Sequence, residues 1–218
     1  MNEQQIFDLS IEEHYFEDDF CISRSNQQVH DYLFKWPLWE SSIVNVNGPK
    51  KSGKTFLLNI FAKKNSFLRI VSKDISKDKI ETILSQKKLI IEDIDQHVNE
   101  ELIFLIYNDF KINNKYLVFS SIEDTSNIKF DIKDLSSRFK SILNIKISNP
   151  SDNLLYSILL KELSSRQIVI KKELLNYIIN RIERSYESIN KFVIKIDKES
   201  LVNKKKIDMK LINKVLSN

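Results

Sequence analysis

Gly48-Pro49-Lys50-Lys51-Ser52-Gly53-Lys54-Thr55 is the stretch that decides the fold, because it matches the pattern G-x-x-x-x-G-K-[ST]. It contains both glycines of the 218-residue chain, where average usage of about 7% would give roughly fifteen. In this pattern backbone N–H groups wrap a polyphosphate, glycines allow close approach and positive φ, and the lysine reaches the phosphate oxygens. We therefore expect all eight residues to bind a nucleotide, with the Thr55 hydroxyl offered to Mg²⁺.

The flanking residues favour a strand before this motif and a helix after it. Residues 42–47 alternate and are rich in β-branched side chains, whereas residues 54–63 have helical spacing. The bound phosphate would then lie at a helix N-terminus, where backbone N–H groups and the helix dipole favour an anion. The alternative is a surface turn made of Gly, Pro and Lys.

A second acidic segment, Leu89-Ile90-Ile91-Glu92-Asp93-Ile94-Asp95, follows further along the chain. An apolar strand that ends in carboxylates beside the phosphate loop is typical of a Walker B strand. We expect Glu92, which stands where Asp is usual, to lie in the Mg²⁺ shell and Asp93 to polarise water. Alone, the segment is equally compatible with a buried strand followed by a solvated acidic turn.

The remaining chain alternates between short apolar runs and helical patterns up to Asn149-Pro150, and is helical thereafter. This order predicts an α/β domain with a five-stranded parallel sheet and then a small all-α lid, the layout of AAA+ P-loop NTPases. The expected further strands are residues 67–72, 88–92, 116–121 and 141–147, and the expected helices are residues 75–85, 99–113, 153–166, 171–184, 186–202 and 209–216.

Composition narrows the function classes. The formal charge of +4, from 34 basic and 30 acidic residues, is mild and does not nominate DNA as a partner. No apolar run approaches the roughly 18 residues of a membrane span, and the first residues do not resemble a signal peptide, so we expect a cytoplasmic protein without a membrane partner. Because the chain has one cysteine, Cys21, and three scattered histidines, we expect no structural metal site.

The sequence resembles the DnaA-related AAA+ proteins and, among them, the Hda/HdaA-type regulators that inactivate the replication initiator DnaA. The resemblance spans almost the whole chain. Besides the two motifs above, it is carried by Gln4-Gln5-Ile6-Phe7-Asp8-Leu9, Asp19-Phe20-Cys21-Ile22-Ser23-Arg24-Ser25-Asn26, Trp36-Pro37-Leu38-Trp39, Leu135-Ser136-Ser137-Arg138-Phe139 and Arg181-Ile182-Glu183-Arg184-Ser185-Tyr186.

The resemblance implies three parts. Residues 1–12 would be a flexible clamp-binding tail, residues 13–149 the AAA+ domain and residues 150–218 the lid. In the tail, Gln4, Phe7 and Leu9 resemble the short peptide that docks on the DNA polymerase III sliding clamp, because a Gln with two apolar anchors suits an apolar groove. The alternative is an ordinary disordered terminus.

The segment from Phe20 to Asn26 resembles the stretch that wraps the adenine in DnaA-type domains, and is thereby implied to bind the nucleotide. Phe20 and Ile22 would lie beside the base, and Asn26 would cap the next helix. Arg138 falls on the position of the family's arginine finger, a guanidinium that stabilises charge on the phosphoryl group of a neighbour's nucleotide. A solvated surface arginine is the alternative. At the position called the second sensor, many AAA+ proteins have an Arg that contacts the nucleotide phosphates. The resemblance places Ser188, or a neighbouring residue other than Arg, at this position, which argues against efficient self-hydrolysis.

The resemblance thus implies an ADP- or ATP-bound regulator, carrying Mg²⁺ with its nucleotide, that docks on the clamp and presents Arg138 to DnaA-bound ATP. It would act more as an activator of hydrolysis by DnaA than as an enzyme. The alternative is a self-acting AAA+ ATPase, a loader or remodeller working as a homo-oligomer through Glu92, Asp93 and Arg138. A DNA-binding module is a third reading, but no helix-turn-helix pattern follows the lid, so we expect no sequence-specific DNA binding.

Overall fold

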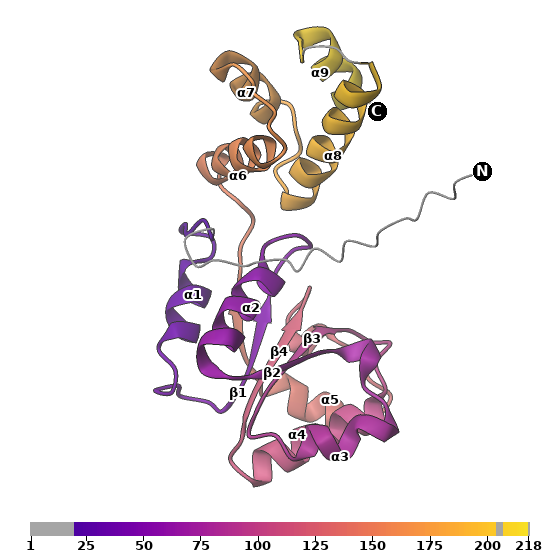
Figure 1. Cartoon of the computed structure of the whole chain (residues 1–218). Helices are drawn as coiled ribbons and strands as arrows, with labels where there is room; N and C mark the ends of the chain where they lie inside the picture. Colours follow the sequence, from indigo (N-terminus) through magenta and orange to yellow (C-terminus); the bar gives the residue numbers. More distant parts are fainter. Residues whose placement is uncertain (1–19, 204–206, 218) are drawn as a thin grey trace, which may run out of the picture.

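Five short apolar segments form one parallel sheet in the computed structural model, which describes residues 20–203 and 207–217. The strand order is β2-β3-β4-β1-β5, and every pairing is parallel. The expected five-stranded parallel sheet is therefore confirmed (Figure 1). The strands are β1 (Ile43–Asn47), β2 (Leu68–Val71), β3 (Lys88–Ile94), β4 (Tyr116–Ser121) and β5 (Leu143–Lys146).

Helices cover both faces of the sheet because side chains of successive strand residues point to opposite faces. On β3, Ile91 packs into the cluster formed with α4 and α5, whereas Ile90 packs into the cluster formed with α1 and α2. The helices and 3₁₀ turns of this domain are α1 (Gln27–Phe34), α2 (Lys54–Asn65), η2 (Ser72–Asp74), η3 (Lys77–Lys79), α3 (Ile80–Leu84), α4 (Glu100–Ile112), η4 (Thr125–Asn127) and α5 (Lys133–Lys140).

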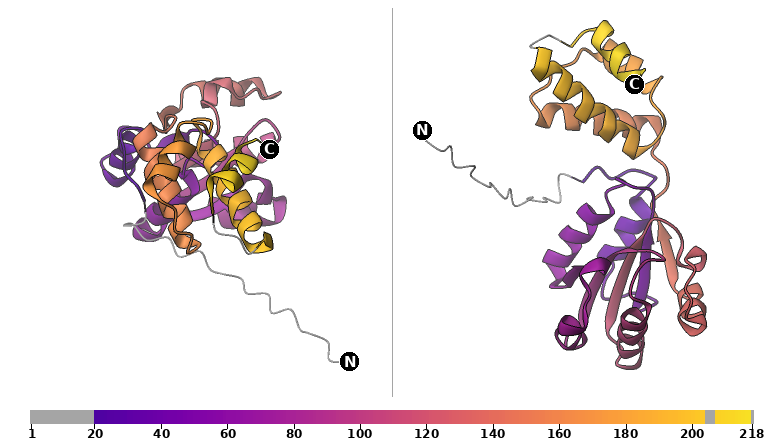
Figure 2. Two further views of the ribbon diagram at one scale, coloured as in Figure 1. Left: turned by 90° about the horizontal axis from the view of Figure 1, so that it is seen from above. Right: turned by 90° about the vertical axis from the view of Figure 1, so that its right-hand side faces the viewer.

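A separate helical lid follows the sheet. Its apolar stripes close on one another around fully buried Leu155, Leu159, Ile189 and Ile196, which gives the lid a core of its own. Figures 1 and 2 show it beyond one end of the α/β domain, reached through the segment after β5. The lid helices are α6 (Asp152–Ser165), α7 (Lys172–Ile179), α8 (Tyr186–Asn203) and α9 (Met209–Leu216). No helix in the described parts of the chain is long and apolar enough to cross a membrane.

Three elements differ from the sequence expectation. The helix expected over residues 75–85 begins only at Ile80, because Ile75 and Ser76 have extended backbone and a 3₁₀ turn intervenes. The helix expected over residues 171–184 ends at Ile179, and the chain then turns so that Arg184 pairs with Asp152 at 2.9 Å. Helix α5 has no counterpart among the expected elements.

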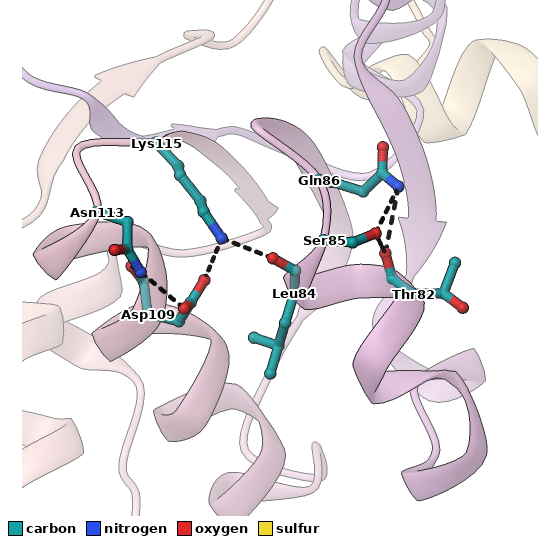
Figure 3. A network of polar contacts seen from close by, with 7 residues as sticks. All are labelled: Thr82, Leu84, Ser85, Gln86, Asp109, Asn113 and Lys115. Carbon is teal, nitrogen blue, oxygen red and sulfur yellow. Dashed lines mark hydrogen bonds and ion pairs between the residues drawn. The ribbon is translucent and has the colours of Figure 1, made fainter.

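A lysine fixes the end of α3 against the end of α4 (Figure 3). Lys115 Nζ donates to the Leu84 carbonyl at 2.6 Å and to Asp109 Oδ2 at 2.6 Å. Asn113 Nδ2 donates to the other oxygen of the same carboxylate at 2.8 Å. The Leu84 carbonyl lies in the last turn of α3, so one cation satisfies an orphan helix carbonyl and a partly buried acid together.

We expect Lys115→Met to lower the free energy of unfolding by about 1.5–3 kcal/mol, because it leaves a carbonyl and a carboxylate without their charged donor. Urea unfolding followed by circular dichroism measures the change. Lys111→Met is the matched control, since Lys111 is an exposed residue of α4 and should shift stability by less than about 0.5 kcal/mol. Equal effects of the two substitutions would contradict the assignment.

Candidate nucleotide-binding site

A cavity of about 1010 Å³ lies between the carboxyl end of the sheet and the lid. Ligands of open parallel sheets bind at this edge, outside the carboxyl ends of the strands. The volume suits a nucleotide, since small-molecule sites span about 300–1,000 Å³. The lining residues are Lys50–Phe56 of the loop and α2, Asp93–His97, Ile122, Glu123, Asn127 and Ile128 of the loops after β3 and β4, and Ile158, Glu162, Tyr186, Ile189 and Asn190 of the lid.

The two glycines are required for different reasons. A Cβ on Gly48 would lie 2.9 Å from both the side-chain Cβ and the carbonyl oxygen of Ile147. The loop therefore leaves β1 too close to the chain after β5 for any other residue. Gly53 has φ +88°, which L side chains rarely adopt, and lies at the N-cap of α2. The expected roles of close approach and positive φ are thus divided between Gly48 and Gly53.

Lys54 carries its charge into the loop. Its Nζ donates to the carbonyls of Gly48 at 2.7 Å and Pro49 at 3.0 Å, and the residue is 8% exposed. Burial lowers the pKa of Lys54, and the nearby carboxylates of Asp93 and Glu92 partly oppose that shift. An anion within the cavity would supply the charged acceptor that these neutral carbonyls do not provide.

Asp93 is presented to the cavity by a bulge. The β3–β4 register shifts between Ile91 and Ile94, and Asp93 has φ 58°. Its backbone is held from two sides: Ser72 Oγ of η2 donates to its carbonyl at 2.7 Å, and its N–H donates to Ser120 Oγ of β4 at 3.3 Å. Such a left-handed residue persists where its surroundings fix it, and these sites are often functional.

Glu92 is placed differently from its neighbour. Arg69 Nε donates to Glu92 Oε1 at 2.9 Å, and a terminal nitrogen of the same guanidinium donates to that oxygen too. Glu92 is 3% exposed and does not line the cavity. The expected magnesium position at Glu92 is therefore occupied by a buried ion pair, a contact that depends on the register of β2 and β3 and has no local sequence signal.

The donors that do line the cavity fit Mg²⁺ bound together with a nucleotide. Thr55 offers a hydroxyl and Asp93 a carboxylate, and Mg²⁺ prefers oxygen ligands with one or two carboxylates and substrate phosphates. Within residues 20–203 and 207–217, no group of three or more His, Cys, Asp or Glu could hold a metal ion by itself.

The adenine residues suggested by the sequence lie beside the loop and do not line the cavity. The Phe20 ring stacks on Phe56 with centroids 5.9 Å apart, and Ile22 is 53% exposed. Asn26 occupies the N-cap position of α1, but its side chain does not cap that helix. Its amide instead accepts from the Ser23 N–H and donates to the Cys21 carbonyl, so it fixes the loop before α1.

The lid contributes Tyr186, which the sequence analysis quoted in the segment of residues 181–186 without giving it a role in the site. Its hydroxyl is 3.2 Å from Ser25 Oγ and donates to the Ser148 carbonyl at 3.4 Å, and burial raises the pKa of Tyr186. This ring joins α8 to the loop before α1 and to the chain after β5. Ser188, the expected second-sensor residue, bonds to Ser185 Oγ at 2.6 Å and does not line the cavity.

Arg138 lies on α5, outside the cavity. Its guanidinium pairs with Asp134 at 3.0 Å and lies over the rings of Phe104, at 5.3 Å, and Tyr107, at 5.9 Å. The side chain is 37% exposed. Glu100 fixes the start of this helix by accepting from the N–H groups preceding it. Gln4, Phe7 and Leu9, the expected clamp-binding residues, lie outside the described residues.

The sequence is similar to a known lid-domain family and to known DnaA proteins. Residues 152–216 match the family model described as "Hda, lid domain". The chromosomal replication initiator protein DnaA of Borrelia garinii is 27% identical over 133 residues, which cover 59% of this chain and 27% of that protein. DnaA of Borreliella burgdorferi matches to the same extent. The chain thus spans about a quarter of the length of these curated relatives.

Two solved structures show the same fold at low sequence identity. Domain III of Thermotoga maritima DnaA superposes with a TM-score of 0.76 at 20% identity, covering 93% of this chain and 95% of that one. AMPPCP-bound DnaA from Aquifex aeolicus gives a TM-score of 0.64 at 17% identity, covering 85% of this chain and 65% of that one. The chain thus has the fold of DnaA domain III, and its residues 152–216 match the Hda lid domain.

Proposed function

We propose that this protein binds ADP or ATP in the cavity between the phosphate loop and the lid. The observation that carries the nucleotide site is the buried Lys54 ammonium, aimed into a glycine loop at the start of α2. A related protein, DnaA from Aquifex aeolicus, is described as AMPPCP-bound. Phe20 shapes the base end of the site through its stack on Phe56, while Thr55 and Asp93 hold the oxygen shell of Mg²⁺.

We further propose that the protein, with its own nucleotide bound, inhibits replication initiation by promoting hydrolysis of the ATP that is bound to DnaA. Arg138 supports this assignment because it is partly exposed on α5 and lies outside its own nucleotide cavity. A guanidinium so placed does not reach the nucleotide of its own chain and would act on that of a neighbouring molecule. Its stack on Phe104 and Tyr107 keeps the side chain ordered without burying the charge.

The reaction supported by Arg138 is phosphoryl transfer to water on the partner's nucleotide. As the bond to the γ-phosphoryl group breaks, charge spreads over its equatorial oxygens, and a planar, permanently charged guanidinium stabilises that charge. To do so, Arg138 would exchange Asp134 for the phosphoryl oxygens. The pair with Asp134 is exposed and costs little to break, since such pairs contribute about 0–1 kcal/mol.

Docking on the DNA polymerase III sliding clamp is proposed for the N-terminal segment through Gln4, Phe7 and Leu9. Clamp loaded on DNA accompanies active synthesis, so attachment would raise the effective concentration of the regulator near DNA-bound DnaA. This would limit the inactivation of DnaA to times when replication is under way.

A self-acting ATPase is the second candidate, and the placement of Asp93 favours it. A carboxylate that lines the cavity beside Lys54 could orient water on the protein's own nucleotide. Arg138 would then serve a neighbouring copy in a homo-oligomer. Turnover that rises with protein concentration in the absence of DnaA, and that is lost in Asp93→Asn, would favour this candidate over the regulator.

Lys54→Met should weaken nucleotide binding about ten- to a hundredfold, since it removes hydrogen bonds between a charged donor and an anion while filling most of the same volume. Titration with a fluorescent ADP analogue measures the dissociation constant. Lys63→Met, near the end of α2 and exposed, is the matched control and should leave that constant unchanged. Unaltered binding by the Lys54 variant would contradict the proposed site.

Arg138→Ala should remove the stimulation of DnaA-bound ATP hydrolysis, by on the order of 10³ in rate, while nucleotide binding stays intact. Single-turnover hydrolysis of radiolabelled ATP on DnaA measures this, with clamp on DNA present. Arg138→Lys should restore little of the rate, because an ammonium lacks the planar fork. Lys140→Ala on the same helix serves as the surface control. Full stimulation by the Arg138→Ala variant would rule out the finger.

The double substitution Gln4→Ala with Phe7→Ala should abolish clamp binding, since it removes the hydrogen-bonding residue and one apolar anchor of the short peptide. Surface plasmon resonance on immobilised clamp provides the measurement, and nucleotide affinity of the same variant reports on folding. Substituting Gln5 instead should leave binding in place. Clamp binding retained by the double variant would exclude this segment as the docking site.

A further inference from the structure

Arg69 on the edge strand β2 takes the carboxylate that the acidic strand would otherwise offer to a metal ion. Two nitrogens of its guanidinium donate to one oxygen of Glu92. Arg69 pairs in register with Ile90, two residues before Glu92 on β3, so both charged side chains emerge on the same face of the sheet. That face carries α1 and α2.

The burial of Glu92 makes its ion pair with Arg69 unfavourable to break. The Glu92 side chain is 3% exposed, whereas that of Arg69 is 27% exposed. A buried carboxylate stripped of its partner would retain an uncompensated charge, which is strongly unfavourable. Arg69, at the edge of the sheet, can reach water more easily. The carboxylate therefore depends on the arginine more than the arginine depends on the carboxylate.

Asp93, unlike Glu92, is not buried. It is exposed, lines the cavity, and has its backbone fixed by Ser72 and Ser120 at the bulge. Successive residues at the end of β3 thus separate two tasks: Glu92 balances an internal cation, and Asp93 remains available in the cavity. Both carboxylates act to raise the pKa of Lys54, against the lowering caused by burial.

We propose that Arg69 withholds Glu92 from the metal shell, so that magnesium-dependent nucleotide binding relies on Asp93 and Thr55. This inference rests on the proposed nucleotide site. It assigns Arg69 a positioning role: the residue sets which of two adjacent carboxylates serves the ion. It also reverses the order expected from the acidic motif, in which the first acid holds the metal and the second one polarises water.

Removing the arginine should release the constraint. In Arg69→Met the buried Glu92 carboxylate loses its counter-charge, and a divalent cation with its nucleotide is the group best able to replace it. Magnesium should then strengthen nucleotide binding more than it does in the wild type. The gain should vanish when Glu92→Gln is combined with Arg69→Met, because a neutral amide offers no charge.

The test is the ratio of ATP dissociation constants measured in EDTA and in Mg²⁺, by isothermal titration calorimetry on the full chain. Glu92→Gln should keep the wild-type ratio within about twofold, since its amide oxygen still accepts from Arg69. Asp93→Asn should reduce the ratio on the order of tenfold, the scale seen when groups around a bound metal are changed. Asn suits the positive φ at this position, so the bulge should survive.

The outcomes separate this inference from the proposed function. A loss of magnesium dependence in Glu92→Gln as large as in Asp93→Asn would overturn it while leaving the nucleotide site standing. Wild-type ATP affinity that does not change with Mg²⁺ would overturn it as well. A wild-type chain that binds no nucleotide at all would overturn both. If Arg69→Met unfolds, the comparison of Glu92→Gln with Asp93→Asn still decides the question.

Discussion

A buried ammonium at the carboxyl end of a parallel sheet is the constraint on which the rest of the structure depends. Lys54 donates to two loop carbonyls. The same loop leaves no room for a Cβ at Gly48, beside Ile147, and has a positive φ at Gly53. Burying a charge without a charged partner is costly. The loop, β1 and the chain after β5 are therefore arranged around one cation that an anionic ligand would stabilise.

The charged residues of the proposed function lie in two separate regions, the cavity and helix α5. Lys54 and Asp93 face the cavity, while Arg138 lies over aromatic rings on α5. A buried polar network connects the strands between them: Asn45 of β1 donates to Ser121 of β4 at 2.8 Å and to Asn144 at 2.7 Å, and Asn144 also accepts from the Thr125 N–H of η4 at 3.1 Å. These hydrogen bonds fix the loops that follow the strands relative to one another, although the Asn45 Oδ1 atom is buried without a partner.

The sequence alone predicts the parts whose signals are local. The apolar runs and the loop pattern of residues 48–55 suffice for the five strands, the phosphate loop and the position of the cavity. Helix α5 was not predicted because only Leu135 and Phe139 of its eight residues are buried. Two apolar positions are too few to define a helical period. The side chain of Asn26 bonds back to its own loop, because a short amide can satisfy turn N–H groups as well as helix N–H groups.

The pairing of Arg69 with Glu92 shows why the remaining site chemistry could not be predicted. Neither residue is unusual by itself, and their meeting depends on the β2–β3 register, which is set by the whole sheet. The bulge at Asp93 is equally nonlocal, since serines of two other segments hold it. A motif names residue types in order, but the partner of each charge decides its role. Where two acids follow one another, the one not held in a buried ion pair is the one left for a ligand.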